Sequence, residues 1–403
     1  MISSEHRKKA LNLCYSLGAI GVFNVVLQLI VYPFLERHMG AEPYGIALSV
    51  LSLIAILNGA CGYAAGCARL LGIERGYCEN GDYNLVLLIM GMLCGIVGIG
   101  YLSVFGLLTP LGALLYLLLS FATMLRFYSE VEFRARVDFF GFMIYYLLIS
   151  LGYIVGLLFL KLSNQWMLVF ITGEALCLAY VVAKGRLLRP PFFERSPHLG
   201  AVMRSIWLVL LSTLIENVAL HSDRILLLSI TRRGSDVTTY YIASLIGKVI
   251  ALLTSPINAL LLSYLVRYRG TLSKKRWRLV LLAAILLGAL ALGVCLWVSP
   301  HFVRLLYPQH LQTVSPYLLT AILGQVLYFI SSVLTTILLR FKGEKKLLLF
   351  NAAYAIEFFT VVILATRAGG LLGFARGVVL ANALRLVGAA IWGYLPSKRT
   401  SEA

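Results

Sequence analysis

Residues 205–230 read SIWLVLLSTLIENVALHSDRILLLSI, an apolar segment long enough to cross a bilayer. At about 100° per residue in a helix, its polar side chains fall on one side, and leucine, valine and isoleucine cover the other. A charged side chain facing lipid costs roughly 2.5–3.5 kcal/mol on insertion scales, so the polar side is expected to face protein or water. The polar residues on that side are Glu216, Asn217, His221, Asp223 and Arg224.

Two interpretations of this helix remain open. Its polar side either lines a hydrated transport cavity or belongs to a buried network that holds helices together. Asp223 and Arg224 are consecutive and therefore about 100° apart on the helix, so they cannot face each other. Each is expected to have a partner on another helix, or a ligand.

The composition is that of a polytopic membrane protein. Of 403 residues, 60% are hydrophobic and 13% are charged, and the mean hydropathy is +0.88. This leaves no room for a catalytic globular domain. The net charge of +18 would suggest nucleic acid as a partner of a soluble chain, but membrane topology explains it better here, and no nucleic acid is expected.

The apolar segments predict an all-α fold with twelve transmembrane helices. The first is a run of about 25 residues ending at Leu35, which exceeds the 7–15 residues of a signal peptide and predicts a retained anchor. The other segments cover approximately residues 44–68, 85–108, 110–128, 139–160, 166–183, 205–230, 240–266, 279–298, 316–339, 347–366 and 371–395.

Residues 184–204 divide the chain near its midpoint. This stretch contains Pro190, Pro191 and Pro197, which interrupt any helix. We expect a cytoplasmic linker here, between an N-terminal lobe of six helices (1–183) and a C-terminal lobe of six helices (205–403).

An internal repeat supports two pseudo-symmetric bundles. Asn24-Val-Val-Leu-Gln28 matches Asn217-Val-Ala-Leu-His221 at a constant offset, and both lie in the first helix of a lobe. Each copy is followed by a tyrosine at the start of the next span. Both lobes begin on the same side, so the repeats are parallel and a substrate path between them is expected.

The distribution of basic residues orients the chain. With the N-terminus inside, the inner segments hold 25 Lys and Arg and the outer loops hold six. This bias places both termini inside and explains the basic charge. The remaining four basic residues lie within spans: Arg224, Lys248, Arg376 and Arg385.

Other polar residues within spans are candidates for the same cavity. Asn24 and Gln28 lie on the first span, and Lys248 either contributes to the cavity or extends its ammonium group outward along its stem. Arg385 suits an anionic head group such as a phosphate, although an Arg–Glu pair between helices would satisfy it equally.

The acidic residues within spans raise the question of ion coupling. Glu174 and Glu357 lie near the middle of the sixth and eleventh spans, where each is either a neutral, hydrogen-bonded carboxyl or a carboxylate that couples transport to Na⁺ or H⁺. Glu216 and Asp223 are candidates for the same role. No cofactor and no metal site is expected, because the seven cysteines form no C-x-x-C pair and five of the six histidines lie outside the spans.

Several segments resemble those of a known family. They are NVVLQLIVYPFLERHMGAEPYGIALSV (24–50), the Asp223-Arg224 pair, YYIASLIGKVIALLTSP (240–256), HFVRLLYPQHLQTVSPYLLTAILGQV (301–326), RFKGEKK (340–346) and GGLLGFARGVV (369–379). Together they resemble oligosaccharide flippases of the Wzx type, which act in O-antigen and teichoic-acid-like synthesis. That family belongs to the multidrug/oligosaccharidyl-lipid/polysaccharide exporter superfamily, with lipid II flippases and multidrug and toxin extruders. The chain departs from the pattern at Phe374 and Arg376, where small residues are commoner.

The resemblance implies a MATE-like fold whose two bundles alternate between inward- and outward-open forms. The cargo would be a polyprenyl-diphosphate-linked oligosaccharide, moved to the outer leaflet of a bacterial cytoplasmic membrane for surface polysaccharide synthesis. Membrane lipids and glycan-assembly enzymes would be partners, and the protein would be a monomer. The expected cavity residues are Asn24, Gln28, Asn217, His221, Arg224, Lys248 and Arg385.

Two alternative functions stay open. A MATE-like efflux antiporter for organic cations would share the architecture but would favour an acidic cavity, whereas this chain has four basic and four acidic residues within spans. A membrane-embedded glycan polymerase or ligase would need an outer catalytic loop, and the longest outer connection, residues 301–315, has only about 15 residues. A transporter without enzymatic activity is therefore expected.

Overall fold

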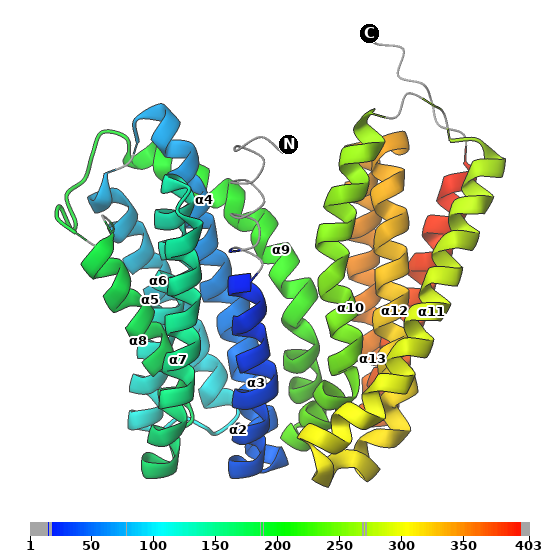
Figure 1. Cartoon of the computed structure of the whole chain (residues 1–403), viewed down its shortest axis with the longest axis horizontal. Coiled ribbons are helices and arrows are strands. Elements are labelled where there is room, and N and C mark those ends of the chain that lie inside the picture. Colours follow the sequence, from blue (N-terminus) through cyan, green and yellow to red (C-terminus); the bar gives the residue numbers. More distant parts are fainter. Residues whose placement is uncertain are drawn as a thin grey trace, which may run out of the picture. The chain divides into compact units, whose positions relative to one another are not determined.

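The computed structural model describes residue 15 and residues 18–77, 79–185, 187, 189–267, 270 and 272–395. Every regular element in this part of the chain is a helix, and the helices run side by side in bundles (Figure 1). The chain folds into two compact units, Met1–Gly40 with Ala47–Ile225, and Ala41–Ile46 with Leu226–Ala403. The division falls within a helix, and the expected limits of the lobes and linker stay a prediction.

The first two spans each contain a π-helical segment. The first, Gly18–Met39, includes η1 (Val26–Val31) and α2 (Tyr32–Met39). The second, Ala41–Ile73, is built from α3 (Ala41–Ile54), η2 (Ala55–Gly59) and α4 (Ala60–Arg75). A π-turn widens the helix by one residue and is frequent at functional sites.

The other helices are long, and most match a predicted span. They are α5 (Asn80–Val104), α6 (Pro110–Arg136), α7 (Phe139–Ser163), α8 (Met167–Lys184), α9 (Leu199–Thr231), α10 (Gly234–Arg267), α11 (Lys274–Leu306), α12 (Leu311–Lys342) and α13 (Glu344–Tyr394), with a short 3₁₀ turn, η3 (Pro308–His310), before α12.

The helix count agrees with twelve spans. Within the described residues, nine helices are long and apolar enough to cross a membrane. Two further long helices, α9 with 33 residues and α10 with 34, are not among these nine. The nine also count α13 once, although it is long enough for two spans. The backbone of α13 leaves helical geometry at Gly369 and Gly370, so its 51 residues form two spans. The predicted all-α, twelve-helix membrane fold is confirmed.

Helix starts follow local chemistry. The Thr109 side chain accepts a hydrogen bond from the Gly112 N–H at 3.0 Å, and Pro110 occupies the first turn of α6. Asp138 accepts from the Gly141 N–H at 2.8 Å in the same way at the start of α7. These side chains replace the missing backbone partners of the first turn.

Close packing of α7 on α8 depends on small residues. A Cβ added at Gly152 would lie 2.5 Å from the Gly173 Cα, and one at Gly156 would lie 2.6 Å from the Val169 Cα. Only glycine lets the two backbones approach this closely. The two arms of α13 are similarly joined, because Gly373 faces the Ala365 carbonyl.

The segment Ala41–Ile46 contacts the start of α10. The Glu42 carboxylate accepts hydrogen bonds from the Gly234 and Ser235 N–H groups, both at 2.7 Å, and the Thr238 hydroxyl donates to the Ala41 carbonyl at 2.6 Å. Glu42 thus provides the acceptor that the first turn of α10 lacks. This contact explains why the segment belongs to the second unit.

Candidate functional site

Arg224 on α9 contacts residues of the first two spans. The Tyr32 hydroxyl is hydrogen-bonded to the Arg224 side chain, and the Ser49 hydroxyl donates to the Arg224 carbonyl at 3.4 Å. Arg224, Asp223 and His221 are all half-buried. The predicted partner of Arg224 therefore includes a side chain of another helix. The Glu216 side chain lies outside the described residues.

The two copies of the internal repeat make the same local hydrogen bond. The Asn24 amide donates to the Ile20 carbonyl, and the Asn217 amide donates to the Thr213 carbonyl, both at 2.9 Å. Both asparagines are half-buried, as is Gln28, which lies within η1. Each asparagine thus satisfies one donor within its own helix and keeps its carbonyl oxygen for other partners.

Glu174 on α8 forms a buried ion pair with Arg126 on α6. The Arg126 Nε lies 2.9 Å from a Glu174 carboxylate oxygen, and the Tyr153 hydroxyl donates to the same carboxylate at 3.1 Å. Glu174 is 1% exposed and Arg126 is 6% exposed. Glu174 is hydrogen-bonded, as one of the two interpretations expected, but it is paired with a cation rather than being a neutral carboxyl. Its role in ion coupling stays a prediction.

The ion pair continues into a network along α6. Glu130 accepts hydrogen bonds from Arg134 at 2.6 Å and from Tyr146 at 2.7 Å, and it lies 3.9 Å from Arg126. Sequence reasoning did not select these residues. A signal was present, because Arg126, Glu130 and Arg134 recur every four residues and therefore share one helix face. Two arginines and two glutamates balance, so the network holds α6, α7 and α8 together.

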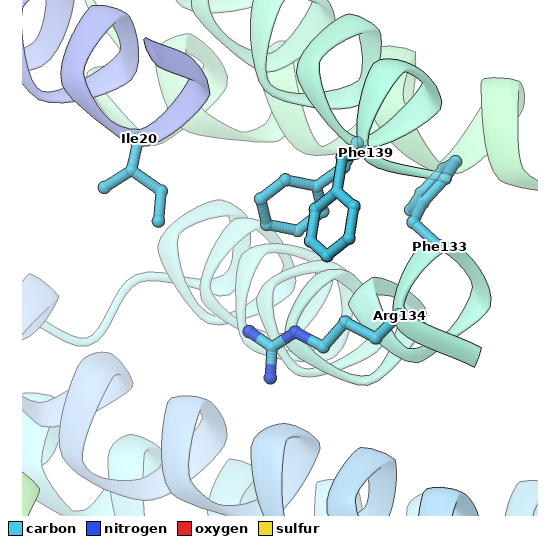
Figure 2. A pocket seen from close by; sticks show the side chains of 5 residues that line it. Ile20, Phe133, Arg134 and Phe139 are labelled. Atoms are coloured by element: carbon cyan, nitrogen blue, oxygen red, sulfur yellow. The ribbon is translucent and has the colours of Figure 1, made fainter. Parts of the chain in front are cut away.

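A cavity of about 330 Å³ lies at one end of this network (Figure 2). Ile20 of the first span lines it, together with Phe133 and Arg134 of α6 and Phe139 and Phe142 of α7. The Arg134 guanidinium extends into the cavity in Figure 2. Because Glu130 pairs with Arg134, the cavity is aromatic with a neutralised cation rather than an anion site.

In the second unit, Arg385 lies on the second arm of α13 and is 8% exposed. Its guanidinium carbon is 4.4 Å from the ring centroid of Tyr354 and 5.0 Å from that of Tyr328. Glu357, half-buried, follows Tyr354 by three residues on the first arm. Lys248 on α10 is also half-buried.

The predicted site residues are distributed over both units. The first unit contains Asn24, Gln28, Asn217, His221, Asp223 and Arg224. It also contains Glu174, which forms the ion pair with Arg126. Lys248, Glu357 and Arg385 lie in the second unit. No cluster of three His, Cys, Asp or Glu side chains suited to a metal occurs in the described part of the chain.

Comparison with known proteins gives structural relatives. No protein-family model and no curated protein sequence matches the chain. The lipid II flippase MurJ in its inward closed conformation superposes with a TM-score of 0.70 and 14% identity, covering 94% of this chain and 87% of MurJ. An inward-facing multidrug resistance MATE family transporter of the MOP superfamily gives 0.63 and 13% identity, covering 92% of this chain and 93% of that one.

The chain has a MATE- and MurJ-like fold. A MOP superfamily transporter from Pyrococcus furiosus, described as having a binding pocket of reversed polarity, also matches, with a TM-score of 0.59 and 13% identity over 96% of this chain and 94% of that one. The expected MATE-like architecture of a multi-pass membrane protein is therefore confirmed. Identities this low show the fold alone, and the resemblance to Wzx-type flippases in particular stays a proposal.

Proposed function

We propose that the protein is a flippase that moves a polyprenyl-diphosphate-linked oligosaccharide from the inner to the outer leaflet of a bacterial cytoplasmic membrane, for surface polysaccharide synthesis. The observation that carries this proposal is Arg224, a half-buried cation within a transmembrane helix, hydrogen-bonded by Tyr32 and accompanied by Asn217 and His221 on the same helix. Such a group serves an anionic, sugar-bearing cargo better than a cationic drug.

The physical need for such residues comes from the cargo. A sugar diphosphate cannot cross hydrocarbon unaided, because each unpaired hydroxyl or charge costs several kcal/mol there. Amide, imidazole and guanidinium groups replace the lost hydration. Asn24, Gln28, Asn217, His221 and Arg224 supply these groups in the first unit, while the lipid tail of the cargo stays in the bilayer.

The membrane potential gives the transport a direction. Two negative charges moving outward through an inside-negative potential of roughly 100 mV gain about 4.6 kcal/mol. Coupling to Na⁺ or H⁺ through Glu216, Asp223 or Glu357 is a further part of the proposal. Glu174 is less suited to release and bind a cation, because Arg126 and Tyr153 already engage its carboxylate.

Replacement of Arg224 tests the proposal. We expect Arg224→Ala to reduce export of the lipid-linked glycan by about tenfold or more, because an interfacial charge contact is worth at least 1.4 kcal/mol. Export is measured in cells as surface glycan per inserted protein. Arg204→Ala, which removes an exposed arginine from the inner end of the same helix, is the matched control and is expected to export normally. Normal export by correctly inserted Arg224→Ala would remove Arg224 from the site.

Efflux of organic cations is the second candidate function, and the likeness to MATE transporters favours it. Ethidium accumulation in the same cells distinguishes the two. A flippase leaves ethidium accumulation unchanged, whereas an efflux antiporter lowers it. We further propose that the protein acts as a monomer beside glycan-assembly enzymes and needs no cofactor.

A further inference from the structure

Arg126 in the first unit and Arg385 in the second are both buried, but within the described part of the chain only Arg126 has a carboxylate partner. Arg126 is 6% exposed and lies 2.9 Å from Glu174. Arg385 is 8% exposed, and none of the ion pairs among the described residues includes it. A buried cation requires a compensating charge or full hydrogen bonding, so the two sites differ in what completes them.

The surroundings of Arg385 leave part of its guanidinium unsatisfied. The Tyr354 hydroxyl lies within hydrogen-bonding reach, and the ring faces of Tyr354 and Tyr328 lie at 4.4 and 5.0 Å from the guanidinium carbon. Its Nε and Nη1 atoms are buried and make no hydrogen bond. Ring faces attract a cation but offer no lone pair to an N–H group, so these donors still require acceptor atoms.

A rigid frame fixes the guanidinium. The Tyr354 hydroxyl donates to the side-chain oxygen of Asn382 (Oδ1) at 2.8 Å. The side-chain amide of Asn382 (Nδ2) in turn donates to the backbone carbonyl of Gly324 at 3.1 Å. Tyr328 and Gly324 belong to α12, and Tyr354 and Asn382 belong to the two arms of α13. The cation is therefore positioned by three helical segments before any ligand arrives.

Glu357, the acidic residue predicted within the same pair of spans, does not neutralise Arg385. Glu357 lies one turn beyond Tyr354, is half-buried, and forms no ion pair with Arg385. One of its carboxylate oxygens is itself buried without a hydrogen-bond partner. The positive charge at Arg385 thus remains available to an external anion.

We propose that Arg385, framed by Tyr328, Tyr354 and Asn382, is a binding residue for a phosphate or diphosphate group. Phosphate oxygens match the planar donors of a guanidinium and carry the missing charge. We assign this bound group to the diphosphate of the polyprenyl carrier, and this assignment rests on the proposed function. Inorganic phosphate has the same chemistry, and the experiment separates the two sources.

The test uses Arg385→Met, which keeps the side-chain volume and removes the charge. Purified full-length protein in phosphatidylcholine nanodiscs is titrated with geranylgeranyl diphosphate. We expect the Kd of Arg385→Met to be about 30-fold higher than that of the unmodified protein. Arg376→Met, which removes an exposed arginine from the same arm, is the matched control and is expected to bind normally.

The melting temperature is a second measurement, and it tests the proposal even if binding is weak. Removing an uncompensated buried charge should not destabilise the protein, so ligand-free Arg385→Met is expected to melt at or above the temperature of the unmodified protein. Geranylgeranyl diphosphate is expected to raise the melting temperature of the unmodified protein only. A large drop in the melting temperature of ligand-free Arg385→Met, or equal Kd values for both proteins, overturns the proposal.

Two further probes separate this proposal from the proposed function. Geranylgeraniol, which lacks phosphate, is expected to bind weakly and without dependence on Arg385. If inorganic pyrophosphate binds as tightly as geranylgeranyl diphosphate and with the same dependence on Arg385, the anion site stands and the lipid-linked cargo loses this support. If no phosphate compound binds, the anion site is wrong, whatever export measurements show.

Discussion

Arg126 and Glu174 show that a charged side chain buried within the membrane requires a partner of opposite charge. Both are almost fully buried, and their charges are satisfied by each other and by Tyr153. Breaking such a pair leaves one charge uncompensated in a medium of low dielectric constant, which costs more than the pair itself contributes.

We therefore expect Arg126→Met to lower the free energy of unfolding by about 3–5 kcal/mol, because Glu174 remains buried without its partner. Glu174→Met should have a similar effect. The double substitution removes both charges and is expected to recover most of the loss. Thermal or denaturant unfolding of the purified protein measures all three variants, and additive losses in the double variant would show that the two residues do not interact.

Residue-scale features were predictable from the sequence only in part. Glu174 and Arg385 were selected as site candidates because each is a charge within an apolar span. Their contacts were not predictable, because Arg126 and Glu174 are 48 residues apart and belong to different helices. Arg126 itself was missed because it lies two residues before the expected end of the fourth span, near residue 128, and was counted among the basic residues of the inner segments. In the structure α6 continues to Arg136, and Arg126 is buried.

At the scale of helices, hydropathy predicted most elements but not their local geometry. The two apolar segments expected at residues 347–366 and 371–395 correspond to the two arms of α13, and the backbone leaves helical geometry between them, with Gly370 at a φ of 56°. The π-helical segments η1 and η2 were not anticipated. A π-turn changes the register by one residue without changing the apolar composition, so hydropathy carries no signal for it.

Helix packing gives a prediction at this scale. Gly152→Ala places a methyl group against the Gly173 backbone on α8 and is expected to destabilise the protein by about 1–3 kcal/mol. Gly100→Ala, also within a helix, has open space around the added Cβ and serves as the control. It is expected to be neutral or slightly stabilising, since alanine favours helix. Equal melting temperatures for the two variants would contradict close packing of α7 on α8.

At the scale of the whole molecule, the sequence predicted the number and order of spans because each apolar run reports on one helix independently. It also predicted a repeat, and the shared Asn24 and Asn217 hydrogen bonds agree with it. It did not predict that Ala41–Ile46 packs in the second unit. The Glu42–Gly234 hydrogen bond joins residues 192 positions apart, and no local pattern encodes such a contact.

The proposed movement of a lipid-linked oligosaccharide between leaflets is tested most directly by reconstitution. Purified protein is placed in liposomes with a polyprenyl-diphosphate-linked glycan labelled on its sugar, and the label on each side is followed with a membrane-impermeant quencher. We expect the label to change sides faster than in protein-free liposomes, and Arg224→Ala to abolish most of the difference. A label that changes sides only at the protein-free rate, while ethidium is transported by the same preparation, would contradict the account.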